Sequence, residues 1–516
     1  MYDYVVADQS FVFDTLADPA THNGKAVERI DTPTSVVFLA GDVAYKLCRA
    51  VAYPELDQSS LSQRLMALEG ERSRGCGFAA WLYQDIVPLT RDPHGSLAIG
   101  GGGETVEWAL RMTRYDPACG LDSIASTSRI DSAMLVELGA MLAESHAGAP
   151  IIDGRRFLSF IDDALRRIGD PADCAEAFIT SRERSNLRQT IEARLRDQRS
   201  LLIARGSAGL VRQCHGRAYL NHIVLHEGRP WLYAPAARFT GGQGIDVLYD
   251  LAASLVDLLL LGPAGSANTL LNTYLWRTRR DADLTGLALL PVFMAMRAIE
   301  AADYAAVRAP LTEGGERETA GLLAARYADL ARRLLTKSDP SLVVIGGFSG
   351  TGKSTLAHKL APGLGAAPGA VVLRSDVERK LLFGVAPFER LDEDAYRPEI
   401  TGAVYRILCE KAEALLCAGH SVVIDAVAAL PEERLAFSDV ALRSGAHMTG
   451  IWLDAREETR LARVSERHHD DSDADAGVVR QQSGFDPGAI DWQRIDAEDA
   501  PSKVLDSARR ASERLH

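Results

Sequence analysis

The sequence lacks a long uninterrupted hydrophobic run, paired cysteines and a basic start. The apolar stretch Leu251–Leu261 contains Asp257, and Leu284–Met296 is shorter than the roughly 20 residues that span a bilayer, so we expect no membrane partner. The seven cysteines are scattered without a CxxC pair, which favours reduced thiols over disulfides or metal ligands. The first residues carry acids and no basic cluster, so we expect a cytoplasmic protein without a secretory signal.

An excess of positive charge is also absent, because the formal net charge of the 516 residues is −13. An acidic surface repels phosphate, so we expect no bulk nucleic-acid binding. The composition, 47% hydrophobic and 25% charged, is typical of globular proteins. The length allows about three domains of roughly 150 residues, or two larger ones.

The clearest seam in the chain is the segment 337–341, which reads KSDPS. A helical pattern, Glu316–Leu335, precedes it, and the apolar run Leu342–Ile345 follows it. A helix, a proline-containing linker and a buried strand are typical of a domain start. We therefore predict one domain over 1–337 and another over 338–516.

The patterns on the two sides of this seam predict different fold classes. In the C-terminal part, short β-branched runs alternate with helical patterns, which predicts an α/β fold with a parallel sheet covered by helices. Its predicted strands are Leu342–Ile345, Ala370–Leu373, Ser421–Ile424 and Thr449–Leu453. In the N-terminal part, strand patterns precede long helical patterns, which predicts a two-lobed α+β domain. Its predicted elements are the hairpin 35–47, the strand Thr105–Met112 and the helices Ser132–Ala147, Ser185–Ala204, Asp246–Leu261 and Leu287–Arg308.

Residues 347–355 read GFSGTGKST and match the Walker A phosphate-loop pattern G-x-x-x-x-G-K-[ST] in full. The glycines allow backbone N–H groups to curl around phosphate oxygens. We expect Lys353 to neutralise the β- and γ-phosphates of ATP, and the Ser354 hydroxyl to ligate Mg²⁺. The predicted ATP-binding residues are Gly347, Ser349, Gly350, Thr351, Gly352, Lys353, Ser354 and Thr355.

Charged residues follow the next two predicted strands. Asp376 stands at the sheet edge where open α/β folds bind ligands, and we predict that it accepts the proton of an acceptor hydroxyl. Arg379 lies one helical turn further and is predicted to clamp the acceptor. An N-cap at residue 375 or 376 is the alternative for Asp376. Asp425 ends a Walker-B-like strand and is predicted to orient Mg²⁺, although many aspartates end strands without function.

An arginine-rich helical pattern over 456–467 precedes the acidic segment 468–475. Arg460, Arg463 and Arg467 fall on one helical face. Because arginines on a lid stabilise charge that develops on a transferred phosphoryl group, we predict that Arg463 or Arg467 closes over the phosphates. A solvated surface face is the alternative.

The phosphate loop, the LRSDVERK stretch and the arginine-rich helix followed by DSDAD together resemble a branch of the P-loop kinases. This branch is similar to gluconate kinase, chloramphenicol phosphotransferase and zeta toxin. The resemblance implies a phosphotransferase in which Asp376 and Arg379, in the D-x-x-R positions, activate an acceptor hydroxyl. Trp492–Asp496 and the helix after it resemble the closing segment, where adenine often packs.

Residues 1–337 resemble the aminoglycoside-phosphotransferase-like kinases, specifically a group often fused ahead of such a P-loop kinase. The segment 41–46, GDVAYK, matches the strand that carries the ATP-phosphate lysine, here Lys46. Glu71 fits the acidic partner of that lysine. Residues 246–252, DVLYDLA, match the I-D-V-x-x-D-L-A helix of this group.

The catalytic loop of this N-terminal domain departs from the group's H-G-D-x-H-x-x-N pattern. Residues 215–222 read HGRAYLNH, so Arg217 replaces the base aspartate and His222 replaces the metal-binding asparagine. Ala234 and Ala237 occupy the acidic positions of the following D-x-x-E-F element. Arginine stays protonated and cannot act as a base. We therefore predict a catalytically degenerate domain with a substrate-selecting or regulatory role.

The sequence thus predicts an ATP- and Mg²⁺-dependent kinase that phosphorylates a small-molecule hydroxyl through its C-terminal domain. One alternative is an ATP-binding regulatory switch with slow hydrolysis. Another is an active N-terminal kinase in which Glu227 or Asp246 replaces the missing acids. A third is toxin-like phosphorylation of a nucleotide sugar.

Overall fold

The computed structural model describes residues 4–53, 56–127, 129–169, 176–235, 244–309, 314–385, 389–466, 473 and 475–513. The chain forms two compact units. The first comprises 1–262 and 293–333, and the second comprises 263–292 and 334–516. The junction at 333/334 lies close to the seam that the sequence indicates. The sequence patterns did not indicate that residues 263–292 belong to the second unit.

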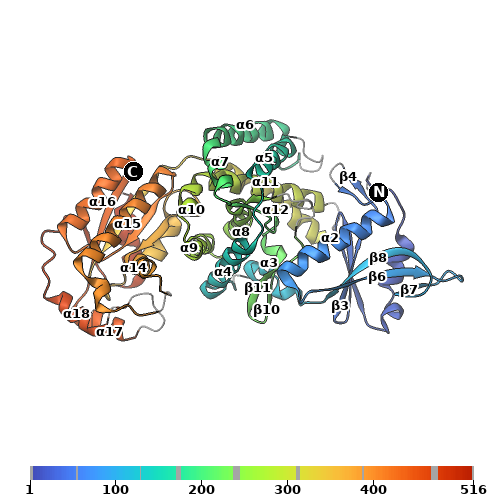
Figure 1. Ribbon diagram of the computed structural model, residues 1–516, viewed down its shortest axis with the longest axis horizontal. Coiled ribbons are helices and arrows are strands. Elements are labelled where there is room, and N and C mark those ends of the chain that lie inside the picture. The colour runs from blue at the N-terminus through green and yellow to red at the C-terminus, as the bar shows by residue number, and fades with distance from the viewer. Residues whose placement is uncertain are drawn as a thin grey trace. The chain divides into compact units, whose positions relative to one another are not determined.

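The first unit begins with a six-stranded antiparallel sheet in the order β1-β2-β3-β8-β6-β7, coloured blue in Figure 1. Side chains alternate between its two faces, and each face has its own core. On one face, Phe38 packs with helix α1; on the other, Leu110 packs with helix α2. The elements are α1 (Ser10–Ala17), β1 (Val27–Asp31), β2 (Ser35–Ala40), β3 (Val43–Cys48), β4 (Ala52–Tyr53), β5 (Leu56–Asp57), α2 (Leu61–Ala79), β6 (Tyr83–Arg91), β7 (Leu97–Ile99) and β8 (Glu104–Thr113).

Helix α8 (Val247–Leu261) is the centre of the helical part of this unit, and it is buried on nearly all sides. Its acidic residues hold the altered catalytic loop, because Asp250 Oδ1 accepts from Gly216 N at 2.9 Å and Asp257 Oδ2 accepts from Leu220 N at 2.7 Å. The surrounding elements are α3 (Leu121–Ser126), α4 (Ser132–Gly148), α5 (Gly154–Gly169), α6 (Ser181–Asp197), α7 (Arg199–Ser207), β9 (Val211–Arg212), β10 (Ile223–His226), β11 (Arg229–Leu232), β12 (Ile245–Asp246), α11 (Leu290–Arg308) and α12 (Gly314–Leu334). The single helix predicted over 185–204 is therefore two helices, α6 and α7.

Among the described residues, one helical stretch, 281–308, is long and apolar enough to cross a membrane by length and composition. However, 72% of its most apolar window is buried within the structure, which is typical of a core helix.

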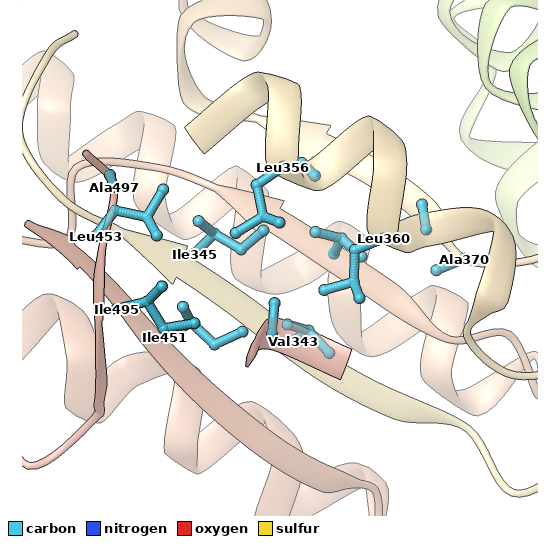
Figure 2. Close-up of a cluster of buried hydrophobic side chains, with 13 residues drawn as sticks. Val343, Ile345, Leu356, Leu360, Ala370, Ile451, Leu453, Ile495 and Ala497 are labelled. Carbon is cyan, nitrogen blue, oxygen red and sulfur yellow. The ribbon is translucent and has the colours of Figure 1, made fainter. Parts of the chain in front are cut away.

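The second unit contains a five-stranded parallel sheet in the order β14-β15-β13-β16-β17. Strand β13 (Ser341–Gly346) is buried along its whole length, as expected for a parallel strand covered on both faces. Figure 2 shows the core on one face, where Ile345 and Ile451 meet Leu356 of helix α13. The other elements are α13 (Lys353–Leu360), β14 (Val371–Arg374), α14 (Ser375–Phe383), α15 (Pro398–Cys417), β15 (Val422–Asp425), α16 (Pro431–Ser444), β16 (His447–Asp454), α17 (Glu457–Ser465), α18 (Ala476–Ser483), β17 (Gln493–Asp496) and α19 (Pro501–Glu513). The four predicted strands and the α/β class are confirmed.

The segment 263–292, which contains α9 (Ser266–Thr278) and α10 (Asp281–Gly286), covers the edge strand of this sheet. Asn268 Nδ2 donates to Ala370 O at 2.9 Å, and Asn272 Oδ1 accepts from Val372 N at 2.7 Å. These amides satisfy backbone groups that an exposed edge would leave open to another strand. This contact explains why the segment belongs to the second unit.

His420 makes a second contact to this segment and confers pH dependence on the unit. Its Nε2 lies 3.0 Å from Leu287 O, and burial lowers the pKa of His420 to about 4. The unfolded chain, with a histidine pKa of about 6.5, therefore takes up a proton first as the pH falls. We expect stability to be lost between about pH 6.5 and about pH 4, on the order of 2 kcal/mol by about pH 5.

Replacing His420 with glutamine keeps a donor for Leu287 O and removes the titration. Calorimetric unfolding midpoints of wild type and His420→Gln are compared at about pH 7 and about pH 5. Between the two pH values, the unfolding midpoint of His420→Gln is expected to fall by less than that of the wild type. Equal losses in the two proteins would rule out His420 as a source of the pH dependence.

Candidate functional site

The phosphate loop joins β13 to α13 at the carboxyl edge of the parallel sheet. Gly347, Gly350 and Gly352 have φ angles of 137°, 85° and 92°, which L side chains rarely adopt. At Gly350, a Cβ would also lie 2.7 Å from Arg460 O. Gly352 faces open space as the N-cap of α13, so only its φ angle requires glycine. The sequence motif thus folds as the strand–loop–helix that phosphate binding requires.

Two donors of this loop are held by oxygen atoms of the chain itself. Lys353 Nζ donates to Phe348 O at 3.2 Å, and Ser349 N donates to Gln482 Oε1 of helix α18 at 2.8 Å. Thr351 is buried and donates to Phe348 O, whereas Thr355 is exposed on α13. An ammonium group and a backbone N–H of such a loop are the donors that phosphate oxygens use.

Arg374, which sequence reasoning missed, joins the two residues that were predicted to bind Mg²⁺. Its Nε lies 3.2 Å from Asp425 Oδ2, and its Nη2 lies 3.2 Å from Ser354 Oγ. The Ser354 hydroxyl and the Asp425 carboxylate are oxygen donors of the kind that Mg²⁺ prefers, so these two residues fit the ion. The Arg374 guanidinium lies between them in this structure and opposes a cation there, so it has to move away before the ion binds. Strand register could have indicated this role, because Arg374 and Asp425 are paired at the ends of the neighbouring strands β14 and β15.

Asp376 lies in the first turn of α14 and is partly exposed. Among the described residues, no hydrogen bond or ion pair engages its carboxylate. The N-cap of the helix is Arg374, without a side-chain cap, so Asp376 does not serve as the N-cap. Its carboxylate is therefore free to accept a proton.

Arg379 is buried and committed to its surroundings. Its Nη1 donates to Ala395 O at 2.6 Å, and its guanidinium lies 4.8 Å from the centre of the Tyr396 ring. The Tyr396 hydroxyl in turn donates to Asp473 Oδ2 at 2.8 Å. In this structure Arg379 thus holds the wall beside Asp376, and its predicted grip on an acceptor stays a prediction.

The structure places Arg463 against the phosphate loop, and its predicted closure over the phosphates stays a prediction. It donates to Ala497 O at 2.8 Å and, at 3.4 to 3.5 Å, to the carbonyls of Gly350 and Thr351. In this structure its guanidinium therefore supports the phosphate loop through backbone carbonyls. A guanidinium that donates to carbonyls has fewer donors left for phosphate. Arg467, the other predicted lid arginine, lies outside the described residues.

Two residues of the acidic segment are described, Asp473 and Asp475, and Asp473 contacts the Arg379–Tyr396 wall beside Asp376. Asp473 Oδ1 lies 2.9 Å from Lys380 Nζ, and Asp473 Oδ2 accepts from Leu391 N. Asp475 caps helix α18 by accepting from Gly477 N at 2.8 Å. Asp473 is therefore anchored beside α14, and Asp475 is anchored to the helix that reaches the phosphate loop.

The first unit keeps its predicted lysine pair but has an altered catalytic loop. Lys46 Nζ on β3 lies 2.7 Å from Glu71 Oε1 on α2. His215 Nε2 contacts Tyr233 O at 2.9 Å, and burial lowers the pKa of His215 to about 4. Arg217 forms no ion pair within the described ranges and stacks on Tyr304.

The side chain at position 234 also lacks a metal-binding group. Ala234 has a φ of 53°, and its N–H donates to Tyr83 Oη at 2.8 Å. A methyl group thus stands where the resemblance implies a carboxylate, which does not fit a metal ion. Ala237, the second such position, lies outside the described residues.

A buried group elsewhere in this unit has the composition of a metal site. The ligand atoms of His146, Cys214 and Asp250 lie within 4.8 Å of one another. However, Arg297 Nη2 lies 3.6 Å from Asp250 Oδ1, which already accepts from Gly216 N. A neighbouring guanidinium opposes a cation, so we interpret the group as a structural support of the loop.

Residues 342–486 match the family described as AAA domain. The C-terminal unit contains a phosphate-loop domain. Over 469 residues, the chain is 26% identical to uncharacterized proteins of Mycobacterium tuberculosis and Mycobacterium bovis, which covers 89% of this chain and 90% of each relative. The match therefore extends over both units.

Solved structures that are similar fall into two groups. A gluconokinase from Sinorhizobium meliloti is 20% identical with a TM-score of 0.25, covering 35% of this chain and 95% of that one. A choline/ethanolamine kinase family protein from Mesorhizobium loti is 16% identical with a TM-score of 0.33, covering 63% of this chain and 98% of that one.

Proposed function

We propose that the protein is an ATP- and Mg²⁺-dependent phosphotransferase whose C-terminal unit phosphorylates a small-molecule hydroxyl. One observation carries the proposal: the three adjacent strands β13, β15 and β14 of a single sheet are followed by the phosphate loop, by Asp425 at the strand end and by the unengaged carboxylate of Asp376. In open α/β folds, ligands bind at this edge. A positioned general base accelerates transfer to an alcohol, whereas nucleotide binding alone does not need one.

In the proposed reaction, Lys353 and the loop amides hold the β- and γ-phosphates. Ser354 and Asp425 would hold Mg²⁺, which neutralises the charge of the phosphates when it is bound. The acceptor oxygen attacks the γ-phosphorus, and the bond from this phosphorus to the bridging oxygen breaks, which releases ADP. Asp376 accepts the proton that the hydroxyl loses.

We further propose that the first unit does not phosphorylate by the usual route and serves in acceptor selection or regulation. The replacement of acids by Arg217 and Ala234 supports this proposal, because phosphoryl transfer depends on metal-held charge. The intact Lys46–Glu71 pair is the feature that favours a retained ligand-binding role.

A nucleotide-binding switch is the second candidate. The contact between Ser349 N and Gln482 favours it, because a loop that binds its own chain suits alternation between two states. The two candidates differ in one property: a kinase requires an acceptor for fast turnover, and a switch does not.

ATP consumption by the full-length protein with Mg²⁺ is measured alone and with panels of sugars, sugar acids, amino alcohols and nucleotide sugars. Without an acceptor, only water can take the phosphoryl group, and it is held less precisely than a bound alcohol. We therefore expect one panel to increase the rate of ATP consumption at least about tenfold. A slow rate that no panel changes would support the switch. A response to nucleotide sugars alone would support the toxin-like alternative.

A further inference from the structure

Arg460 of helix α17 is a buried arginine without a counter-ion. Its side chain is 4% exposed, and among the described residues no carboxylate forms an ion pair with it. Only Nη2 is engaged, by Ser483 Oγ at 2.7 Å, while Nε and Nη1 are buried without a hydrogen-bond partner. A buried charge without a partner is destabilising, so such a residue calls for a functional reason.

This guanidinium lies against the phosphate loop. It is 5.4 Å from the centre of the Phe348 ring, and the Arg460 backbone occupies the space where a Cβ at position 350 would stand. Ser483, which holds Arg460, directly follows Gln482, which holds Ser349 N. The end of α18 therefore contacts both a loop amide and an unpaired cation.

The other arginines of the site have more of their donors engaged, and Arg379 has one buried nitrogen, Nε, without a hydrogen-bond partner. Arg463 donates to three backbone carbonyls, and Arg374 lies between Asp425 and Ser354. Arg460 has two unused nitrogen donors instead. The geometry thus singles out the arginine for which sequence reasoning had proposed no role.

We propose that Arg460 binds the terminal phosphate of the nucleotide, and that this phosphate takes the place of the Gln482 side chain at Ser349 N. In the present structure, Gln482 Oε1 stands 2.8 Å from that amide, as an oxygen of a phosphate would. The anion supplies the counter-charge that Arg460 lacks, and charge-assisted hydrogen bonds to phosphate are strong. This inference rests on the proposed function only in requiring that the C-terminal unit binds ATP.

The test uses Arg460→Met in the full-length protein, with Arg480→Met as the matched control because Arg480 is exposed on α18. Calorimetric titration gives the Kd values for ATP and ADP. We expect Arg460→Met to weaken ATP binding by about 10- to 100-fold and ADP binding by less than about threefold. The control is expected to change neither value.

Thermal unfolding without nucleotide distinguishes a binding role from a structural role. Removing an unpaired buried charge is expected to leave the midpoint unchanged or higher, while the ATP-induced shift decreases. A lower midpoint together with an unchanged ratio of ATP to ADP affinity would overturn the proposal. Failure of Arg460→Met to fold would also overturn it.

Gln482→Ala tests the exchange at Ser349 N separately, with the exposed neighbour Gln481→Ala as control. Removing the competing oxygen is expected to tighten ATP binding by about 2- to 10-fold. Unchanged or weaker binding would contradict the exchange. Every test of Arg460 and Gln482 measures nucleotide binding. A protein that binds ATP but shows no turnover with any acceptor would therefore refute the kinase proposal and leave the proposed phosphate contact of Arg460 unaffected.

Discussion

Lys353→Ala is expected to abolish ATP consumption by the full-length protein, with a loss of at least about a hundredfold. The Lys353 ammonium is the charge that the loop aims at the phosphates, and alanine removes it without altering the glycines that shape the backbone. Lys353 is partly exposed, and its Nζ donates to Phe348 O at 3.2 Å within the same loop, so the fold should tolerate the change. Initial rates of ADP release with and without acceptor provide the measurement.

Lys359→Ala is the matched control, because this lysine is exposed on the same helix, α13. Lys46→Ala locates the chemistry: if the first unit is inert, turnover survives the loss of the lysine that pairs with Glu71. Substantial turnover by Lys353→Ala combined with its loss in Lys46→Ala would assign the reaction to the first unit. The missing acids at 217 and 234 would then have to be supplied by other residues.

The sequence predicted the local parts of this site because their signals are local. A phosphate loop is defined by consecutive residues, and buried parallel strands appear as short apolar runs such as 342–345. Strand β1 (Val27–Asp31) lacks such a local signal and was therefore not predicted. Four of its five residues are exposed, so its sequence shows no alternation of apolar and polar residues.

Residues whose role depends on distant partners could not be predicted. Arg374 is informative only once β14 and β15 are known to be neighbours, and Arg460 only once α18 is placed on the phosphate loop. Helical spacing put Arg460 and Arg463 on one face of α17, but it could not tell that backbone carbonyls would accept from Arg463 and leave two nitrogens of Arg460 without a partner. Likewise, Asn268 shows its role only against the edge of β14.

The second large effect is expected for Asp376→Asn, which should reduce acceptor phosphorylation by about 10²- to 10⁴-fold, the usual contribution of a general base. Asparagine has nearly the same shape but does not take up the proton from the acceptor hydroxyl. No described residue hydrogen-bonds the carboxylate, so the exchange leaves no buried donor unsatisfied, and Kd for ATP should stay within about twofold. Phosphorylated product is quantified alongside ATP binding.

Asp491→Asn serves as the control for Asp376→Asn, since Asp491 is an exposed carboxylate of the same unit. A selective loss of kcat with unchanged ATP binding is the signature of a base, because the proton is transferred only in the reaction step. A parallel loss of ATP binding would instead indicate that Asp376 shapes the nucleotide site. Full acceptor turnover in Asp376→Asn would leave it as a surface residue of α14. The partly exposed position of Asp376 beside the Arg379–Tyr396 wall favours the first outcome, because it is the one carboxylate among Asp376, Asp425 and Asp473 that the described structure leaves unengaged.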